Sequence, residues 1–169
     1  IEGSDAAQDI SQILKSLEET VSSTLNALYP AGLNQENPLA EEIKLVLVPA
    51  IIGHGGFASD MAVVTYTDRN WVGSSFKTIS HHEIVHVLDR KLNDDSPRPS
   101  ILSEGIAVYL SGGHYRDGDP LLRAAALLEL GQYIPLENLA NDFYNAQHEI
   151  AYIEGAALVA YMVELWGWE

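Results

Sequence analysis

The feature that most constrains this chain is a pair of histidines four residues apart inside an apolar helical run. The segment at residues 82–86 reads H-E-I-V-H. Positions i and i+4 lie on one face of an α-helix, so His82 and His86 present two imidazoles side by side, with the carboxylate of Glu83 next to the first. Two nitrogens in this arrangement can hold one zinc ion and leave Glu83 near the open side of the metal.

A third metal ligand is predicted in the segment L-S-E-G-I-A at residues 102–107. Seventeen residues separate His86 from Glu104, enough for one helix to end, a loop to turn and a second helix to bring Glu104 back. Two histidines and one glutamate leave a fourth position for water, which is the ligand set of a catalytic zinc rather than a closed structural one. His81 lies about 100° around the helix from His82, so we expect a structural or ligand-supporting role for it.

These two segments resemble those of the gluzincin metallopeptidases, both the aminopeptidase N type of catalytic domain and the smaller peptidase MA-like domains. A third segment, A-Y-I-E-G-A at residues 151–156, is similar to the Y-x-K-G helix of that family, whose tyrosine hydrogen-bonds the oxyanion of the tetrahedral intermediate. The resemblance implies that role for Tyr152. It covers roughly residues 45–167, while the first forty residues carry no resemblance and have no assigned role.

The chain departs from the family in two places. Aminopeptidases of this type carry G-x-M-E-N on a strand before the zinc-binding helix, and its glutamate holds the free amino terminus of the substrate. The matching segment at residues 55–59 reads G-G-F-A-S, so Ala58 stands where the family has the acid. The spacing from the histidines to Glu104 is also one residue shorter. The resemblance therefore implies a zinc-dependent peptidase, and the missing acid favours an endopeptidase.

The expected reaction is hydrolysis of a peptide bond by a zinc-activated water, with Glu83 as the general base that passes the proton to the leaving nitrogen. Tyr152 would donate to the developing oxyanion. His114 and His148 are rivals for that task, because His148 precedes Tyr152 by one helical turn. Asp89 could accept a hydrogen bond from a histidine ligand and so orient its ring. The simpler interpretation of Asp89 is an exposed acid on the helix.

Three alternative functions remain open. The chain could be an aminopeptidase that uses Glu154 or another carboxylate as a non-standard amine anchor. The same zinc site could serve a different hydrolysis, or the chain could be a binding module that keeps zinc for shape without turnover. Glu83 argues against the last alternative, because a structural zinc site has no use for a general base. His54, among glycines, is interpreted as a turn residue rather than as a ligand.

Composition restricts the partners. The formal net charge of −15, from 24 acidic against 9 basic residues, argues against binding to nucleic acid or to anionic membrane surfaces. Cysteine is absent, which excludes disulfides and a thiolate zinc site. No apolar run reaches the roughly 18 residues of a membrane span. The expected partner is a peptide or protein substrate. The chain begins with Ile1 rather than Met, which favours an extracytoplasmic or secreted protein that has lost an N-terminal segment.

Hydrophobic periodicity predicts an α+β fold, with a small, mostly antiparallel sheet covered by helices on one side. A length of 169 residues favours one domain. The family resemblance implies that this domain is a zincin-like (thermolysin-type) catalytic domain. Strands are predicted at residues 43–48 and 61–67, with a glycine turn at 53–56 between them. A strand edge, after Gly56 or near Asp68, is expected to bind the extended substrate. Helices are predicted at residues 5–28, 77–92, 101–111, 120–130 and 146–166, with Ser74 or Ser75 capping the second and Ser100 the third.

Overall fold

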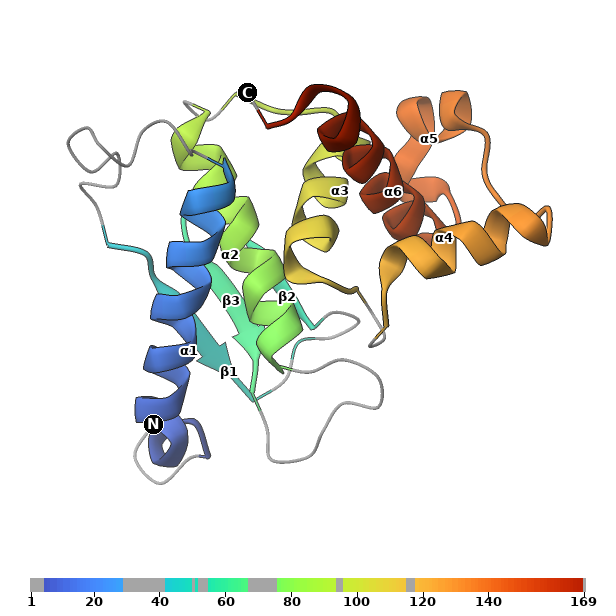
Figure 1. Ribbon diagram of the computed structural model, residues 1–169. Helices are drawn as coiled ribbons and strands as arrows, with labels where there is room; N and C mark the ends of the chain where they lie inside the picture. The colour runs from blue at the N-terminus through green and yellow to red at the C-terminus, as the bar shows by residue number, and fades with distance from the viewer. Residues whose placement is uncertain are drawn as a thin grey trace. The chain divides into compact units, whose positions relative to one another are not determined.

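The structure is a computed structural model that describes residues 5–28, 42–49, 51, 55–66, 76–93, 96–114 and 118–168. It consists of helices and one small sheet, so the predicted α+β class is confirmed (Figure 1). The chain divides into two compact units, Ile1–Ser96 and Pro97–Glu169. The expectation of a single domain stays a prediction. His54 and the cap expected at Ser74 or Ser75 lie outside the described residues.

The first unit contains a three-stranded sheet with the order β1-β3-β2. Strand β1 (Leu45–Val48) pairs in parallel with β3 (Ala62–Thr65), so both predicted strands are confirmed in slightly shorter form. Strand β2 (Gly56–Ala58) pairs with β3 in the antiparallel sense.

This sheet is mixed, and the prediction of a mostly antiparallel sheet is wrong. Strand β3 lies between β1 and β2, although β2 comes between them in the sequence. A tight turn, in which the Ser59 amide donates to the Met61 carbonyl at 2.9 Å, then reverses the direction so that β3 runs parallel to β1. The glycine turn was predicted to extend to residue 56, but Gly56 is the first residue of β2.

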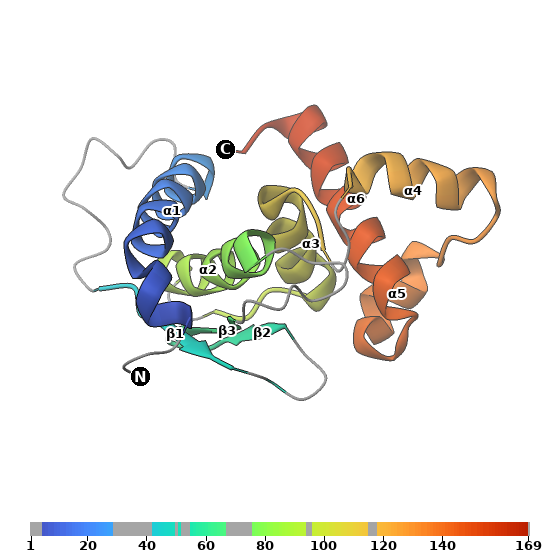
Figure 2. The ribbon, with the colours of Figure 1, turned by 90° about the horizontal axis from the view of Figure 1, so that it is seen from below.

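Two helices cover one face of this sheet (Figure 2). Helix α2 (Phe76–Leu92) packs on β2 and β3, and helix α1 (Asp5–Leu28) packs against α2. Both match the predicted ranges closely. Their shared core is formed by Ala62, Ile84, Val87 and Leu88, with Leu17, Val21, Leu25 and Leu28 of α1 packed against it. The sequence places these four residues on one apolar stripe of α1 together with Ile10, Ile13 and Leu14. Ile13 is buried as that stripe predicts, whereas Ile10 and Leu14 are exposed.

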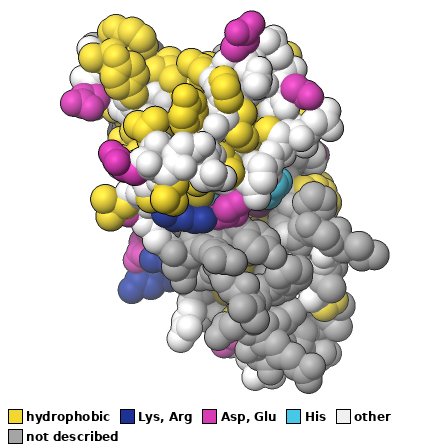
Figure 3. All heavy atoms as spheres, turned by 90° about the vertical axis from the view of Figure 1, so that its right-hand side faces the viewer, with side chains coloured by type: hydrophobic (Ala, Val, Ile, Leu, Met, Phe, Trp, Pro, Cys, Tyr) yellow, Lys and Arg dark blue, Asp and Glu magenta, His cyan; other side chains and the backbone are white. Residues whose placement is uncertain are grey.

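The second unit is helical. Its elements are α3 (Ser100–Ser111), α4 (Pro120–Glu129), α5 (Leu136–Asp142), the 3-10 turn η1 (Phe143–Asn145) and α6 (His148–Trp166). Hydrophobic side chains gather on the face of this unit seen in Figure 3, and those exposed on α4 include Leu121, Leu122 and Leu128. Within the described part of the chain, no helix is long and apolar enough to cross a membrane.

The ends of these helices are set by local residues. Gly112 closes α3 in the left-handed region, with φ of 72°. The expected Ser100 cap is wrong, because α3 begins at Ser100 itself and its N-cap, Pro99, makes no side-chain capping hydrogen bond. Proline holds an extended backbone at residue 99, so the cap position falls there and the helix starts one residue earlier than a Ser100 cap would place it. Asp119 and Gln147 cap α4 and α6 through their side-chain oxygens.

Two glycines let α3 and α6 approach closely. A Cβ added at Gly105 would lie 2.4 Å from the carbonyl oxygen of Gly155, and one added at Gly155 would lie 3.0 Å from the carbonyl oxygen of Ile101. Backbone atoms cannot move aside as the end of a flexible side chain can. The crossing therefore holds Glu104, next to Gly105, at a defined place beside the helix that carries Tyr152.

Replacing Gly105 by Ala should lower the free energy of unfolding by about 2–3 kcal/mol, because the added methyl overpacks a backbone contact. The change at Gly155 should cost less, about 1 kcal/mol, since its nearest contact is longer. Gly112→Asn serves as the control, because its position is open and asparagine tolerates the left-handed region. Urea unfolding followed by circular dichroism measures all three. Equal stabilities for Gly105→Ala and Gly112→Asn would contradict the close crossing.

Candidate metal centre

The centre begins with the two histidines of α2. His82 is buried, with 8% of its surface exposed, and His86 is partly buried. Their Nε2 atoms lie 3.1 Å apart, and their rings meet edge to face. Two ligands bound tetrahedrally to one zinc at about 2.05 Å would be separated by about 3.3 Å. The helical spacing and the burial of α2 thus bring two imidazole nitrogens to the separation that a shared ion requires.

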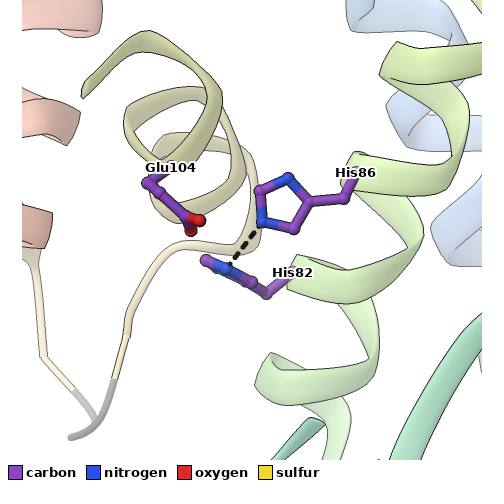
Figure 4. A group of neighbouring side chains, drawn as sticks. All are labelled: His82, His86 and Glu104. Atoms are coloured by element: carbon purple, nitrogen blue, oxygen red, sulfur yellow. Dashed lines mark hydrogen bonds between the residues drawn. The ribbon is translucent and has the colours of Figure 1, made fainter. Parts of the chain in front are cut away.

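Glu104 of α3 completes a group that could hold a metal ion (Figure 4). One potential ligand atom of each of His82, His86 and Glu104 lies within 4.8 Å of the others. Glu104 is 9% exposed. The three predicted ligands are therefore positioned as a possible metal site. Two imidazoles and a carboxylate suit zinc and other transition metals that bind nitrogen and oxygen.

Tyr144 supports Glu104, although no sequence pattern indicates this residue. Its hydroxyl donates to Oε1 of Glu104 at 3.1 Å. The pKa of this hydroxyl is raised, first by partial burial of the hydroxyl end and then by the negative charge of Glu104, while a hydrogen bond with Ser100 opposes the change. Tyr144 keeps its proton and so remains a donor. A carboxylate ligand fixed by such a donor is oriented before any ion arrives.

Glu83 lies on the same helix as the histidine pair and is 7% exposed. Its side chain rests against the backbone of the edge strand β2. A Cβ added at Gly56 would lie 2.8 Å from Glu83 Cγ, 2.9 Å from its Oε1 and 3.0 Å from the Val63 carbonyl oxygen. Glycine is therefore the residue that leaves room for the Glu83 carboxylate at this point of the sheet.

His81 points away from the metal group, as its phase around the helix predicts. Its Nε2 and the Thr24 hydroxyl of α1 are hydrogen-bonded at 3.0 Å. Burial lowers the pKa of His81, and the nearby His82 and Lys77 lower it further, so the neutral ring is favoured. The structural role expected for His81 is confirmed, because it ties α2 to α1.

Tyr152 lies on α6 among aromatic rings. The His114 ring stacks on it with a centroid distance of 4.0 Å, and the His148 ring lies at 4.4 Å. Both predicted rivals are thus beside Tyr152, and the expectation that His148 shares its face of α6 is confirmed. Phe143 packs against the same tyrosine at 5.2 Å. The oxyanion role of Tyr152 stays a prediction.

Three further residues from the sequence analysis can be placed. Ala58 packs against the core of the first unit. Oε1 of Glu154 accepts a hydrogen bond from the Ile134 amide at 2.8 Å, and burial raises the pKa of this carboxyl although that bond opposes the rise. Glu154 is therefore engaged in holding the loop before α5. Asp89 is 9% exposed, which excludes the simpler interpretation of an exposed acid, and its orienting role stays a prediction.

Comparison of the chain with protein-family models, with curated proteins and with solved structures finds no match. The centre consists of two imidazoles, a carboxylate with a tyrosine donor, and a second buried carboxylate on the histidine helix.

Gly56→Ala should destabilise the first unit by about 1–3 kcal/mol, because the new methyl collides with Glu83 and with the Val63 carbonyl. Gly55→Ala is the matched control. A Cβ there meets only the end of the Ile79 side chain, at 2.7 Å, which can rotate away. Urea unfolding should show a clearly larger loss for Gly56→Ala. If the two variants are equally stable, Glu83 does not rest on the strand as described.

Tyr144→Phe should weaken zinc binding by about 10-fold, within the range for loss of a group that orients a ligand. The fold should be unchanged, because Tyr144 is 67% exposed. Tyr161→Phe, which removes a hydroxyl from another exposed tyrosine, controls for the substitution itself. Titration with zinc against a competing chelator measures both affinities. Unchanged affinity in Tyr144→Phe would show that its bond to Glu104 has no part in ligand orientation.

Proposed function

We propose that this chain is a zinc-dependent peptidase of the gluzincin type with a zincin-like fold. The observation that carries the proposal is the group of His82, His86 and Glu104, which has the donor set of a catalytic zinc with a position left for water. The order of these residues supports it, since H-E-x-x-H on one helix precedes L-x-E-G on the next, as in the family that the sequence resembles.

The chain's own residues supply the remaining chemistry. A zinc ion bound here would lower the pKa of a water molecule and polarise the scissile carbonyl. Glu83 would take the proton from that water and deliver it to the leaving nitrogen. Its burial against β2 favours this role, because a carboxylate held at one place keeps the geometry that proton transfer needs. Tyr152 would donate a hydrogen bond to the developing oxyanion, and Tyr144 would hold Glu104.

Substrate binding is proposed at strand β2. It stands at the edge of the three-stranded sheet, next to Glu83. An extended peptide could pair with this edge through its backbone and so bring its scissile bond near the general base. The net charge of −15 favours basic or neutral peptides over acidic ones.

Cleavage within a chain is favoured over removal of its first residue. Ala58, at the position of the family's amine-binding glutamate, offers no carboxylate, and its side chain packs into the core. The alternative anchor, Glu154, is occupied by the amide of Ile134. An ammonium group brought into a partly desolvated site without a carboxylate partner is costly. These observations support an endopeptidase rather than an aminopeptidase.

Glu83→Gln should retain the fold and zinc binding but lower turnover by about 10²–10⁴-fold, because only the proton-accepting group is lost. Hydrolysis of a mixed peptide library by the zinc-loaded protein, with and without a chelator, measures the effect. Glu137→Gln, an exposed acid on α5, is the control. Full activity in Glu83→Gln would remove the general base. A wild-type protein that binds zinc and cleaves nothing would instead be the binding module.

Amino-terminally acetylated peptides should be cleaved about as fast as the same peptides with a free amine, since no carboxylate is proposed to hold a chain end. The kcat/KM values for one peptide in both forms, together with the mass of the products, measure this directly. A strong preference for the free amine, with single residues released, would contradict the endopeptidase and establish the aminopeptidase alternative.

A further inference from the structure

A second group of potential metal ligands lies within the second unit. It consists of His114, which follows α3, and of His148 and Glu149 in the first turn of α6. One potential ligand atom of each lies within 4.8 Å of the others. The donor set is again two imidazoles and a carboxylate. No part of the proposed peptidase chemistry requires this group as ligands.

The contact between His114 and Glu149 has the geometry of two ligands rather than of a hydrogen bond. His114 Nδ1 and Glu149 Oε2 are 3.6 Å apart, beyond the usual length of a hydrogen bond. Ligands at tetrahedral positions around one zinc are separated by about 3.3 Å. A small rotation of either side chain would therefore bring both atoms to the distance at which one ion binds them together.

Arg123 of α4 orients the carboxylate. It donates to Oε1 of Glu149, whereas the oxygen nearer to His114 is Oε2. A carboxylate with one oxygen on a guanidinium and the other turned toward an imidazole is the arrangement expected when a supporting residue positions a metal ligand. The charge of Arg123 and the N-terminus of α6 both oppose a cation, so they lower the affinity while the donor set is preserved.

The group is accessible to an ion from solution. His148 is exposed, and the side chains of His114 and Glu149 are 13% and 23% exposed. The His114 ring is held by stacking on Tyr152, which limits its rotation. His114 is thus fixed by its aromatic neighbour and Glu149 by its ion pair, whereas His148 can turn inward from the surface.

We propose that His114, His148 and Glu149 form a second metal site, for zinc or another transition-metal ion that binds imidazole and carboxylate. This site is independent of the peptidase proposal, because it shares no ligand with His82, His86 and Glu104. Its place beside Tyr152 means that occupancy restrains the His114 and His148 rings that flank this tyrosine.

Titration of the metal-free full chain with zinc, by calorimetry and against a competing chelator, tests the site. Wild type should bind two ions, His148→Ala one and His86→Ala one. Zinc affinity at the second site should fall by at least about 100-fold in His148→Ala. Loss of a residue that only orients a ligand costs about 10- to 100-fold, and loss of a ligand should cost at least as much as the upper end of that range. Glu164→Gln, which removes an exposed acid elsewhere on α6, should still bind two.

His148→Phe separates metal binding from ring packing. It keeps an aromatic ring beside Tyr152 but offers no ligand atom, so it should lose the second ion as His148→Ala does. Circular dichroism confirms that each variant is folded. If His148→Ala and His148→Phe bind as many zinc ions as wild type with the same affinities, the second site is refuted. Loss of an ion only in the His148 variants, with His86→Ala unchanged, would support it and refute the peptidase centre.

Discussion

Helix α2 holds two imidazole nitrogens 3.1 Å apart, and the arrangement of the first unit depends on how that helix is buried. Ile84, Val87 and Leu88 pack into the core beside the sheet, while His82 and Glu83 are buried in other directions. Burying imidazole and carboxylate groups costs free energy unless they gain partners. The helix thus buries imidazole and carboxylate groups beside the sheet, and its apolar residues supply the packing.

In the second unit, the position of Glu104 depends on a close crossing of two helices. The backbones of α3 and α6 meet at Gly105 and Gly155, where no side chain fits. Glu104 precedes the first of these glycines, and the hydroxyl of Tyr144 donates to its carboxylate. A close crossing of helices is rigid because interiors are densely packed. Glu104 is therefore held by the close helix crossing beside it and by the hydrogen bond to its carboxylate.

Structural features that depend on the spacing of neighbouring residues could be predicted from the sequence. The apolar period of residues 5–28 gave its helix, and H-E-I-V-H gave two residues of a possible metal group, because helical phase is fixed by spacing. Strand direction could not be predicted, since the loop that sets it carries no pairing signal. Strand β2 was missed because three residues beginning with glycine show no alternation. The contact of Tyr144 with Glu104 joins residues forty positions apart, which no local pattern encodes.

The most direct test of the account is a crystal structure of the zinc-loaded chain, with the ion located by its anomalous scattering. The account predicts a peak bonded to the Nε2 atoms of His82 and His86 at about 2.0–2.1 Å and to a carboxylate oxygen of Glu104 at about 2.0–2.2 Å. Glu83 should lie near the remaining position without bonding the ion. An ion held by the histidine pair with Glu104 turned away, or no ion at the pair at all, would contradict the account.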